Sequence, residues 1–137
     1  MKIKQISVFA ENKPGRLNAI LEALDTAKIN LEAISVSETT EFGIVRMIMD
    51  KPEAGAEALK TAGFTERADL MLSAEIPDKP SSLLTMVVEP LAQAGINISY
   101  FYAFLEHKAN QARIVLKTSD NEKAEKVLAE MSGSGRG

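Results

Sequence analysis

Along the first half of the chain, segments whose hydrophobic positions repeat as in a strand alternate with segments whose hydrophobic positions repeat as in a helix. Residues 2–10 alternate with a period of two, which is typical of a strand. Leu17, Ile20, Leu21 and Leu24 repeat at i, i+3, i+4 and i+7, which predicts a helix with one apolar stripe. The same reading predicts strands over 30–37 and 43–49, a helix that begins with Asp50 as its N-cap and ends at Gly63, and an extended segment over 65–76.

The order of these elements then repeats. Residues 12–17 (Asn-Lys-Pro-Gly-Arg-Leu) correspond to residues 78–83 (Asp-Lys-Pro-Ser-Ser-Leu) at an offset of 66 positions. Residues 27–31 correspond to residues 94–98 at an offset of 67 positions, so the second copy has gained one residue between the two landmarks. Two landmarks in the same order and at nearly the same spacing indicate an internal duplication.

Two features of the second copy do not fit the repeat. Pro90 falls inside its first predicted helix, where it removes a backbone hydrogen bond and should kink the helix. The final strand is missing, because residues 132–137 have no strand character. The predicted elements are a helix over 83–94, strands over 97–105 and 112–117, and a last helix that begins with a capping box of Ser119 and Glu122.

Each copy therefore predicts a ferredoxin-like βαββαβ unit of the α+β class, with an antiparallel sheet that carries both helices on one face. The units are expected at 1–68 and 69–137. No linker is expected between them, because the segment 65–76 lacks a Gly- or Pro-rich spacer. The strand 98–105 is apolar on both sides, so both sides are expected to be buried. Together with the missing strand this predicts a homodimer, although the two copies could instead cover each other within one chain.

Composition excludes several classes of protein. Cysteine is absent and His107 is the only histidine, which argues against a disulfide scaffold, a thiolate metal site and a bound metal cofactor. The net charge is −3 without a basic stripe, so nucleic acid is not an expected partner. RNA-recognition domains share this order of elements, but they need aromatic side chains on the third strand, and residues 43–49 have none. No apolar run is long enough to span a bilayer and no signal peptide is visible, so we expect a cytoplasmic protein that does not contact membranes.

The Lys-Pro-Gly-Arg-Leu turn at 13–17, followed by Ile-Asn-Leu at 29–31, resembles the ACT domain, and the resemblance covers nearly all of the chain as two tandem copies. ACT domains are regulatory modules that commonly bind amino acids at interfaces between paired domains. Their contacts usually come from the loop after the first strand and from the start of the second strand. This resemblance implies that the ligand-binding residues are Asn12, Lys13, Pro14, Gly15, Arg16, Leu17, Asn30 and Leu31, and more weakly Asp78, Ser81, Ser82, Leu83, Asn97 and Ile98.

The chemistry of the first loop suits an amino acid independently of the resemblance. The start of the helix at Arg16 offers free backbone N–H groups and a positive dipole end to a carboxylate. Gly15 has no Cβ, so a ligand can approach the backbone, whereas Ser81 occupies this position in the second copy. Side-chain oxygens of Asn12 and Asn30 could accept from the ammonium group. Asn30 could equally serve a tight turn, and Arg16 could equally be a solvated residue of the first helical turn.

Catalytic chemistry finds little support in the sequence. Ser81 and Ser82 lack an evident general base, and no pair of carboxylates stands out from the charged helix faces. We therefore predict a non-catalytic sensor that binds a free amino acid and passes the signal to a regulated metabolic enzyme. The alternative is a structural interaction module whose ligand site is degenerate. Within the first reading, copy one is expected to supply the main carboxylate-binding loop.

Overall fold

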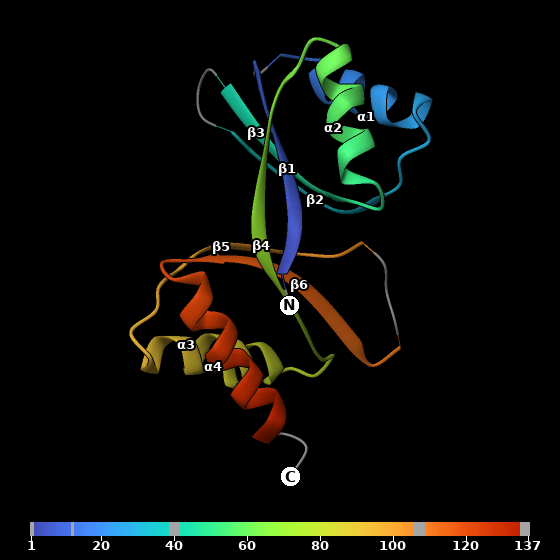
Figure 1. Ribbon diagram of the computed structural model, residues 1–137. Coiled ribbons are helices and arrows are strands. Elements are labelled where there is room, and N and C mark those ends of the chain that lie inside the picture. Colours follow the sequence, from blue (N-terminus) through green and yellow to red (C-terminus); the bar gives the residue numbers. More distant parts are fainter. Residues whose placement is uncertain (1, 12, 39–41, 106–108, 135–137) are drawn as a thin grey trace. The chain divides into compact units, whose positions relative to one another are not determined.

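The computed structural model describes residues 2–11, 13–38, 42–105 and 109–134, and it divides into two compact units (Figure 1). The N-terminal unit comprises Lys4–Leu70, and the C-terminal unit comprises Met71–Gly137 together with Met1–Ile3. The sequence placed the division between Ala68 and Asp69, and the compact units divide between Leu70 and Met71.

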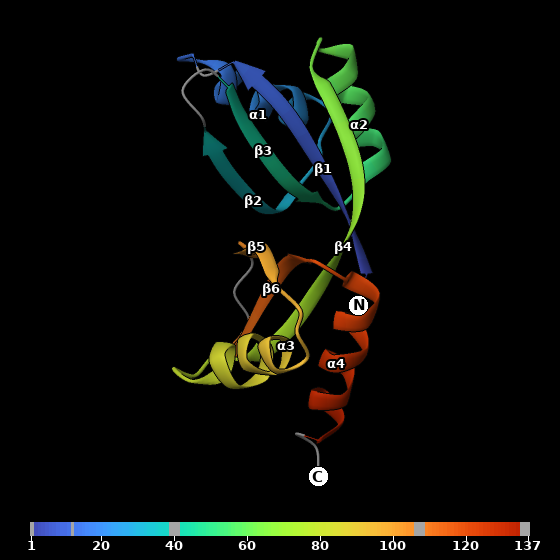
Figure 2. The same cartoon turned by 90° about the vertical axis from the view of Figure 1, so that its left-hand side faces the viewer.

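The N-terminal unit has the βαββαβ order that the periodicity predicts. Its strands lie in the order β2-β3-β1-β4, and β3 runs antiparallel to both β1 and β2. Two helices pack side by side on one face of this sheet (Figure 2), and their apolar stripes close a core around Ile6, Leu24 and Met47. The elements are β1 (Lys2–Glu11), α1 (Arg16–Thr26), β2 (Leu31–Glu38), β3 (Phe42–Met49), α2 (Pro52–Thr61) and the first part of β4 (Thr65–Pro77).

The C-terminal unit repeats this arrangement, with strand order β4-β6-β5 and a core around Leu72, Leu91 and Leu116. The strand that the sequence lacks after the last helix has a substitute: Lys2 and Ile3, at the start of β1, belong to this unit, and β1 is the hydrogen-bonded neighbour of β4. The elements are the second part of β4, a π-helical turn η1 (Leu84–Val88), α3 (Glu89–Gln93), β5 (Ile98–Ala103), β6 (Gln111–Thr118) and α4 (Asn121–Ser134).

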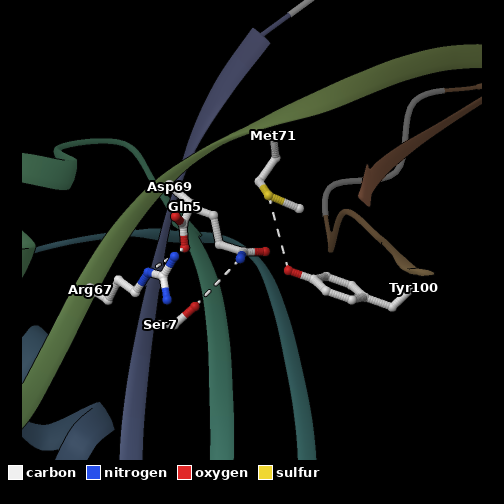
Figure 3. Close-up of polar contacts among 6 residues, drawn as sticks. All are labelled: Gln5, Ser7, Arg67, Asp69, Met71 and Tyr100. Atoms are coloured by element: carbon white, nitrogen blue, oxygen red, sulfur yellow. Dashed lines mark hydrogen bonds and ion pairs between the residues drawn. The ribbon is translucent and has the colours of Figure 1, made fainter. Parts of the chain in front are cut away.

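The strand β4 confirms the expectation that no linker interrupts residues 65–76. It runs without a break from Thr65 to Pro77, so its first part completes one unit and its second part begins the other. Figure 3 shows three polar contacts of β1, β4 and β5, among them the one from Gln5 Nε2 to Ser7 Oγ at 3.4 Å. In the N-terminal unit Arg67 Nε lies 3.3 Å from Asp69 Oδ2, and in the C-terminal unit the Tyr100 hydroxyl lies 4.0 Å from Met71 Sδ.

Backbone hydrogen bonds confirm the duplication in detail. The Arg16 N–H donates to the Lys13 carbonyl at 3.3 Å, and the Ser82 N–H donates to the Lys79 carbonyl at 3.1 Å, in keeping with the offset of 66. Later in each copy, the bond from Ile29 to Leu24 recurs from Ile96 to Leu91, at the offset of 67. Both β2 and β5 carry a bulge directly after their first residue, before Ala33 and Tyr100 respectively. The two copies therefore share one backbone design.

The extra residue of the second copy lies in the π-helical turn η1. Equivalent backbone bonds keep the offset of 66 up to Thr85 and show the offset of 67 from Pro90 onward, so the insertion falls between these two residues. A π turn accommodates one additional residue within a helix. In a regular α-helix the ring of Pro90 would clash with the carbonyl of Met86. The wider turn before α3 relieves that clash, so the interruption expected at Pro90 takes the form of a π turn.

Both helix N-caps that the sequence predicted are wrong. The N-cap residue of α2 is Lys51, which makes no side-chain cap bond, and Asp50 instead accepts the Asn30 N–H at 2.9 Å. In the second copy Ser119 Oγ accepts the Asn97 N–H at 3.0 Å, while Asp120 accepts the Lys123 N–H at the start of α4. Each presumed cap therefore anchors the residue that precedes a strand.

The strand β5 departs from the expectation of burial on both sides. Tyr100 and Tyr102 stack with ring centroids 6.5 Å apart, and Tyr102 is buried. Phe101, however, is 45% exposed, and Leu105 beyond the strand is also exposed. The strand lies at the edge of its sheet, which explains why one row of its side chains is left open. The homodimer remains a prediction.

Candidate functional site

The loop after β1 turns into α1 through a left-handed glycine. Gly15 has φ 87° and is the N-cap residue of α1, with no side-chain cap bond. Upstream, the Lys13 N–H donates to the Glu11 carbonyl at 2.9 Å and closes the turn. The N–H groups of Leu17 and Asn18 have no backbone acceptor among the described residues. The loop thus presents two adjacent donors at the positive end of a helix.

Space is open beside Gly15. A Cβ added at this position would meet no heavy atom within 4 Å. The backbone of the turn is therefore accessible to a small ligand from that side, and Lys13, Pro14, Arg16 and Leu17 are all exposed around it.

Three charged side chains surround the same turn. Lys13 Nζ lies 2.7 Å from Glu11 Oε2, and Arg16 Nη2 lies 3.9 Å from Glu11 Oε1. The hydrogen bond from Lys13, aided by the positive charges of Lys13 and Arg16, lowers the pKa of Glu11. The contact of Arg16 is too long for a hydrogen bond, so the Arg16 guanidinium keeps donors for a carboxylate.

A groove of about 350 Å³ begins at these charges and runs along the end of the sheet. Glu11 and Arg16 line its charged end. Most of the other lining side chains are apolar: Phe9 lies on the face of β1 opposite to the helices, Phe42 starts β3 and Phe64 follows α2. The lining residues are Phe9, Ala10, Glu11, Arg16, Phe42, Gly63, Phe64 and Thr65, and all of them belong to the N-terminal unit.

The two halves of the predicted first site lie at opposite ends of this unit. Because β1 and β2 are both antiparallel to β3, they run parallel, so β2 begins at the end where β1 began. Helix α1 has 11 residues and spans about 16 Å between these ends. Asn30 and Leu31 are therefore not brought to the loop within one unit. The backbone of Asn30 is tied to Asp50 in both directions, at 2.9 and 3.1 Å.

The second copy keeps the backbone of the loop and changes its side chains. Ser81 corresponds to Gly15, and its carbonyl accepts from both the N–H and the hydroxyl of Thr85. Ser82, which corresponds to Arg16, is buried instead of exposed. Asp78 and Leu83 flank this loop, whereas Asn97 and Ile98 start β5 at the other end of the unit. This loop therefore lacks the exposed guanidinium of the first copy, whereas Lys79 keeps an exposed ammonium group at the position of Lys13.

Sequence reasoning missed the groove and with it Glu11, Phe9, Phe42 and Phe64. Glu11 and Phe42 are register partners across β1 and β3, although 30 other residues separate them in the sequence. Alternation alone shows that Phe9 points away from the helices, but it does not reveal which residues of other strands lie beside it. Asn12 and His107 lie outside the described residues.

Two further findings bear on the class of protein. Over the described residues, no cluster of three or more His, Cys, Asp or Glu side chains is suited to hold a metal ion. No helix in this same part of the chain is long and apolar enough to cross a membrane.

Comparisons with known proteins agree with this architecture. Protein BT0572 from Bacteroides thetaiotaomicron is 33% identical in a crystal structure with a TM-score of 0.88, over 96% of this chain and 90% of that one. The ligand-free regulatory subunit of aspartate kinase from Thermus thermophilus is 17% identical with a TM-score of 0.64, over 93% of this chain and 91% of that one, which shows a shared fold. The regulatory subunit of aspartate kinase from Thermus flavus has a TM-score of 0.58 at the same identity and coverage.

No curated protein matches the sequence significantly. The model of the ACT domain pair family, in contrast, matches residues 1–133, which is nearly the whole chain. The tandem units, their antiparallel sheets and their helices on one face confirm the fold that the sequence predicted. The chain belongs to the ACT domain pair family.

Proposed function

We propose that this chain is a non-catalytic regulatory sensor that binds a free amino acid at an interface between ACT units and signals to a partner enzyme. The observation that carries the proposal is the turn at Gly15. Its open backbone, the two N–H groups of Leu17 and Asn18 and the Arg16 guanidinium together suit a carboxylate. The Glu11 carboxylate beside them suits an ammonium group.

The position of Asn30 and Leu31 supports the interface part of the proposal. A ligand of amino-acid size that contacts the Gly15 turn does not reach the other end of the same unit, about 16 Å away. If Asn30 also contacts the ligand, it must come from another ACT unit, for instance that of a second copy of the chain. A homodimer would supply such a unit.

Signalling to an enzyme is supported by the fold. The same tandem fold forms the regulatory subunit of an aspartate kinase from Thermus thermophilus. By this likeness of fold, the proposed enzyme is a partner to which the chain passes its signal.

A thermal-denaturation screen of the full chain against the twenty amino acids tests the proposal. A ligand that binds only the folded state must raise the melting temperature, and a concentration of 100 times Kd stabilises by about 2.7 kcal/mol. We expect one amino acid or a chemically related group to raise the melting temperature in a concentration-dependent way. If all twenty leave it unchanged at millimolar concentration, the chain is the structural interaction module of the alternative reading.

A further inference from the structure

We infer that the groove beside the Gly15 turn takes the side chain of the bound amino acid, and that this side chain is large and apolar, with aromatic amino acids preferred. The inference rests on the proposed function and narrows the class of its ligand. It follows from the arrangement of the lining residues, because charged residues lie at one end of the groove and apolar residues line the remainder.

The charged end of the groove has the polarity of an amino acid backbone. Arg16 and Glu11 both line the groove and lie next to each other, with 3.9 Å between Arg16 Nη2 and Glu11 Oε1. Lys13 holds the other oxygen of Glu11 at 2.7 Å and does not line the groove. Oε1 of Glu11 can therefore accept an ammonium group while Arg16 binds the carboxylate, so that the ligand enters as a zwitterion.

The remainder of the groove is apolar and open. Phe9 is 44% exposed and Phe42 is 55% exposed, although both are large hydrophobic side chains. Phe64 packs against the core on the helix side of the sheet, whereas Phe9 and Phe42 lie on the opposite face. An aromatic ligand can stack on such rings edge to face or in an offset arrangement, which adds to the gain from burial of its surface. A volume of about 350 Å³ is at the small end for ligand sites and suits one amino acid.

The second copy provides an internal contrast, because the positions equivalent to Glu11, Arg16 and Phe42 carry neither these charges nor this ring. The register pair Glu11 and Phe42 corresponds to Pro77 and Gln111. Arg16 corresponds to Ser82, through the matching backbone bonds of the two loops. Both copies fold with the same backbone, so the fold itself does not require these side chains at the end of the sheet. Their presence in the first copy alone is explained by a ligand.

Calorimetric titration of the full chain tests the inference with four probes: L-phenylalanine, L-leucine, L-alanine and 3-phenylpropanoate. We expect L-phenylalanine to bind about tenfold or more tightly than L-alanine, with L-leucine between them. Replacing Phe42 by Ala should weaken L-phenylalanine about fivefold and leave L-alanine within about twofold. Leu70→Ala is the matched control, because Leu70 is an equally exposed apolar side chain of the same unit, at 62%, and does not line the groove.

Variants of Glu11 and Arg16 test which of these residues binds the ammonium group of the ligand and which binds its carboxylate. Glu11→Gln should weaken L-phenylalanine and leave 3-phenylpropanoate, which has no ammonium group, unchanged or tighter. Arg16→Gln should weaken both probes. Equal effects of Glu11→Gln on both probes would refute the zwitterion arrangement.

The outcomes separate this inference from the proposed function. If L-alanine or another small amino acid binds as tightly as L-phenylalanine, and Phe42→Ala and Phe9→Ala change nothing, the groove is not the side-chain pocket and the inference fails while the sensor function stands. If no amino acid binds to the wild-type chain, the proposed function itself fails.

Discussion

Substitutions of Gly15 distinguish two roles of this residue: its left-handed backbone conformation contributes to stability, and its lack of a side chain lets a ligand approach. The residue has φ 87°, a conformation that a β-branched residue adopts only under strain. A Cβ there would meet no atom within 4 Å, so a substitution creates no clash inside the protein. The whole effect of Gly15→Val on folding should therefore come from the backbone, about 1–3 kcal/mol of lost stability. The variant should fold, but it should be less stable than the wild-type protein even though the added side chain clashes with no other atom.

Gly15→Asn is the more informative variant. Asparagine tolerates the left-handed region, so this variant should lose less stability than Gly15→Val. Its side chain nevertheless fills the space through which a ligand reaches the backbone. Urea denaturation measures the first effect as a change in midpoint without a change in slope, and calorimetric titration with the ligand found in the thermal screen measures the second. We expect Gly15→Asn to keep most of its stability and to lose binding.

Ser81→Ala is the control in the second copy, because Ser81 occupies the position that corresponds to Gly15. It should change the binding free energy by no more than roughly 1 kcal/mol, the contribution of one ordinary hydrogen bond. Normal binding by Gly15→Asn would show that the ligand does not approach this turn. Normal binding by Gly15→Asn combined with lost binding by Ser81→Ala would move the site to the second copy.

Three further predictions concern the anchor, the charges and the assembly. Asp50→Ala should lower the free energy of unfolding by about 1–2 kcal/mol, because it removes the acceptor of the Asn30 N–H, and Asp25→Ala in urea denaturation is its control. The hydrogen bond from Lys13 lowers the pKa of Glu11, so the contact between the two side chains is fully present above the ordinary carboxyl pKa of about 4.3 and is lost as the pH falls through the lowered pKa. Calorimetry should therefore show that L-phenylalanine binds more weakly at that acidic pH, where Glu11 becomes protonated, and that its affinity is constant from about pH 6 to 8. Light scattering should find a dimer at micromolar concentration, and Phe101→Lys should shift it to a monomer if the exposed edge strand β5 forms the contact.

The sequence predicted the elements well because the helix-facing side chains of each unit form one hydrophobic core. Alternation and helical stripes report which side chains face that core, and both kinds of pattern were clear in both copies. The number of residues between landmarks also indicated an insertion in the second copy. It did not show where the insertion lies, since only the hydrogen bonds around Pro90 locate it in a π turn.

The predictions that failed depended on partners far away in the sequence. Asp50 and Ser119 each precede a glutamate by three residues, which is the local pattern of a capping box. Each instead accepts a backbone N–H from the residue that precedes a strand, 20 and 22 positions earlier. Glu11 and Phe42 likewise meet only through the register of β1 and β3. Local spacing does not contain this information, so neither the anchors nor the groove could be predicted from it.

The duplication itself distinguishes what the fold needs from what is free to serve a ligand. Asn30 of the first copy corresponds to Asn97 of the second, and the backbone of each is tied to the residue two positions before the next helix. This shared role is sufficient to explain their presence without any ligand. The charged and aromatic side chains of the groove occur in one copy only, on a backbone that folds in the same way without them. A binding role is therefore better supported for the Gly15 turn and its groove than for either asparagine, and the N-terminal unit is where a mutational search for the sensor site should begin.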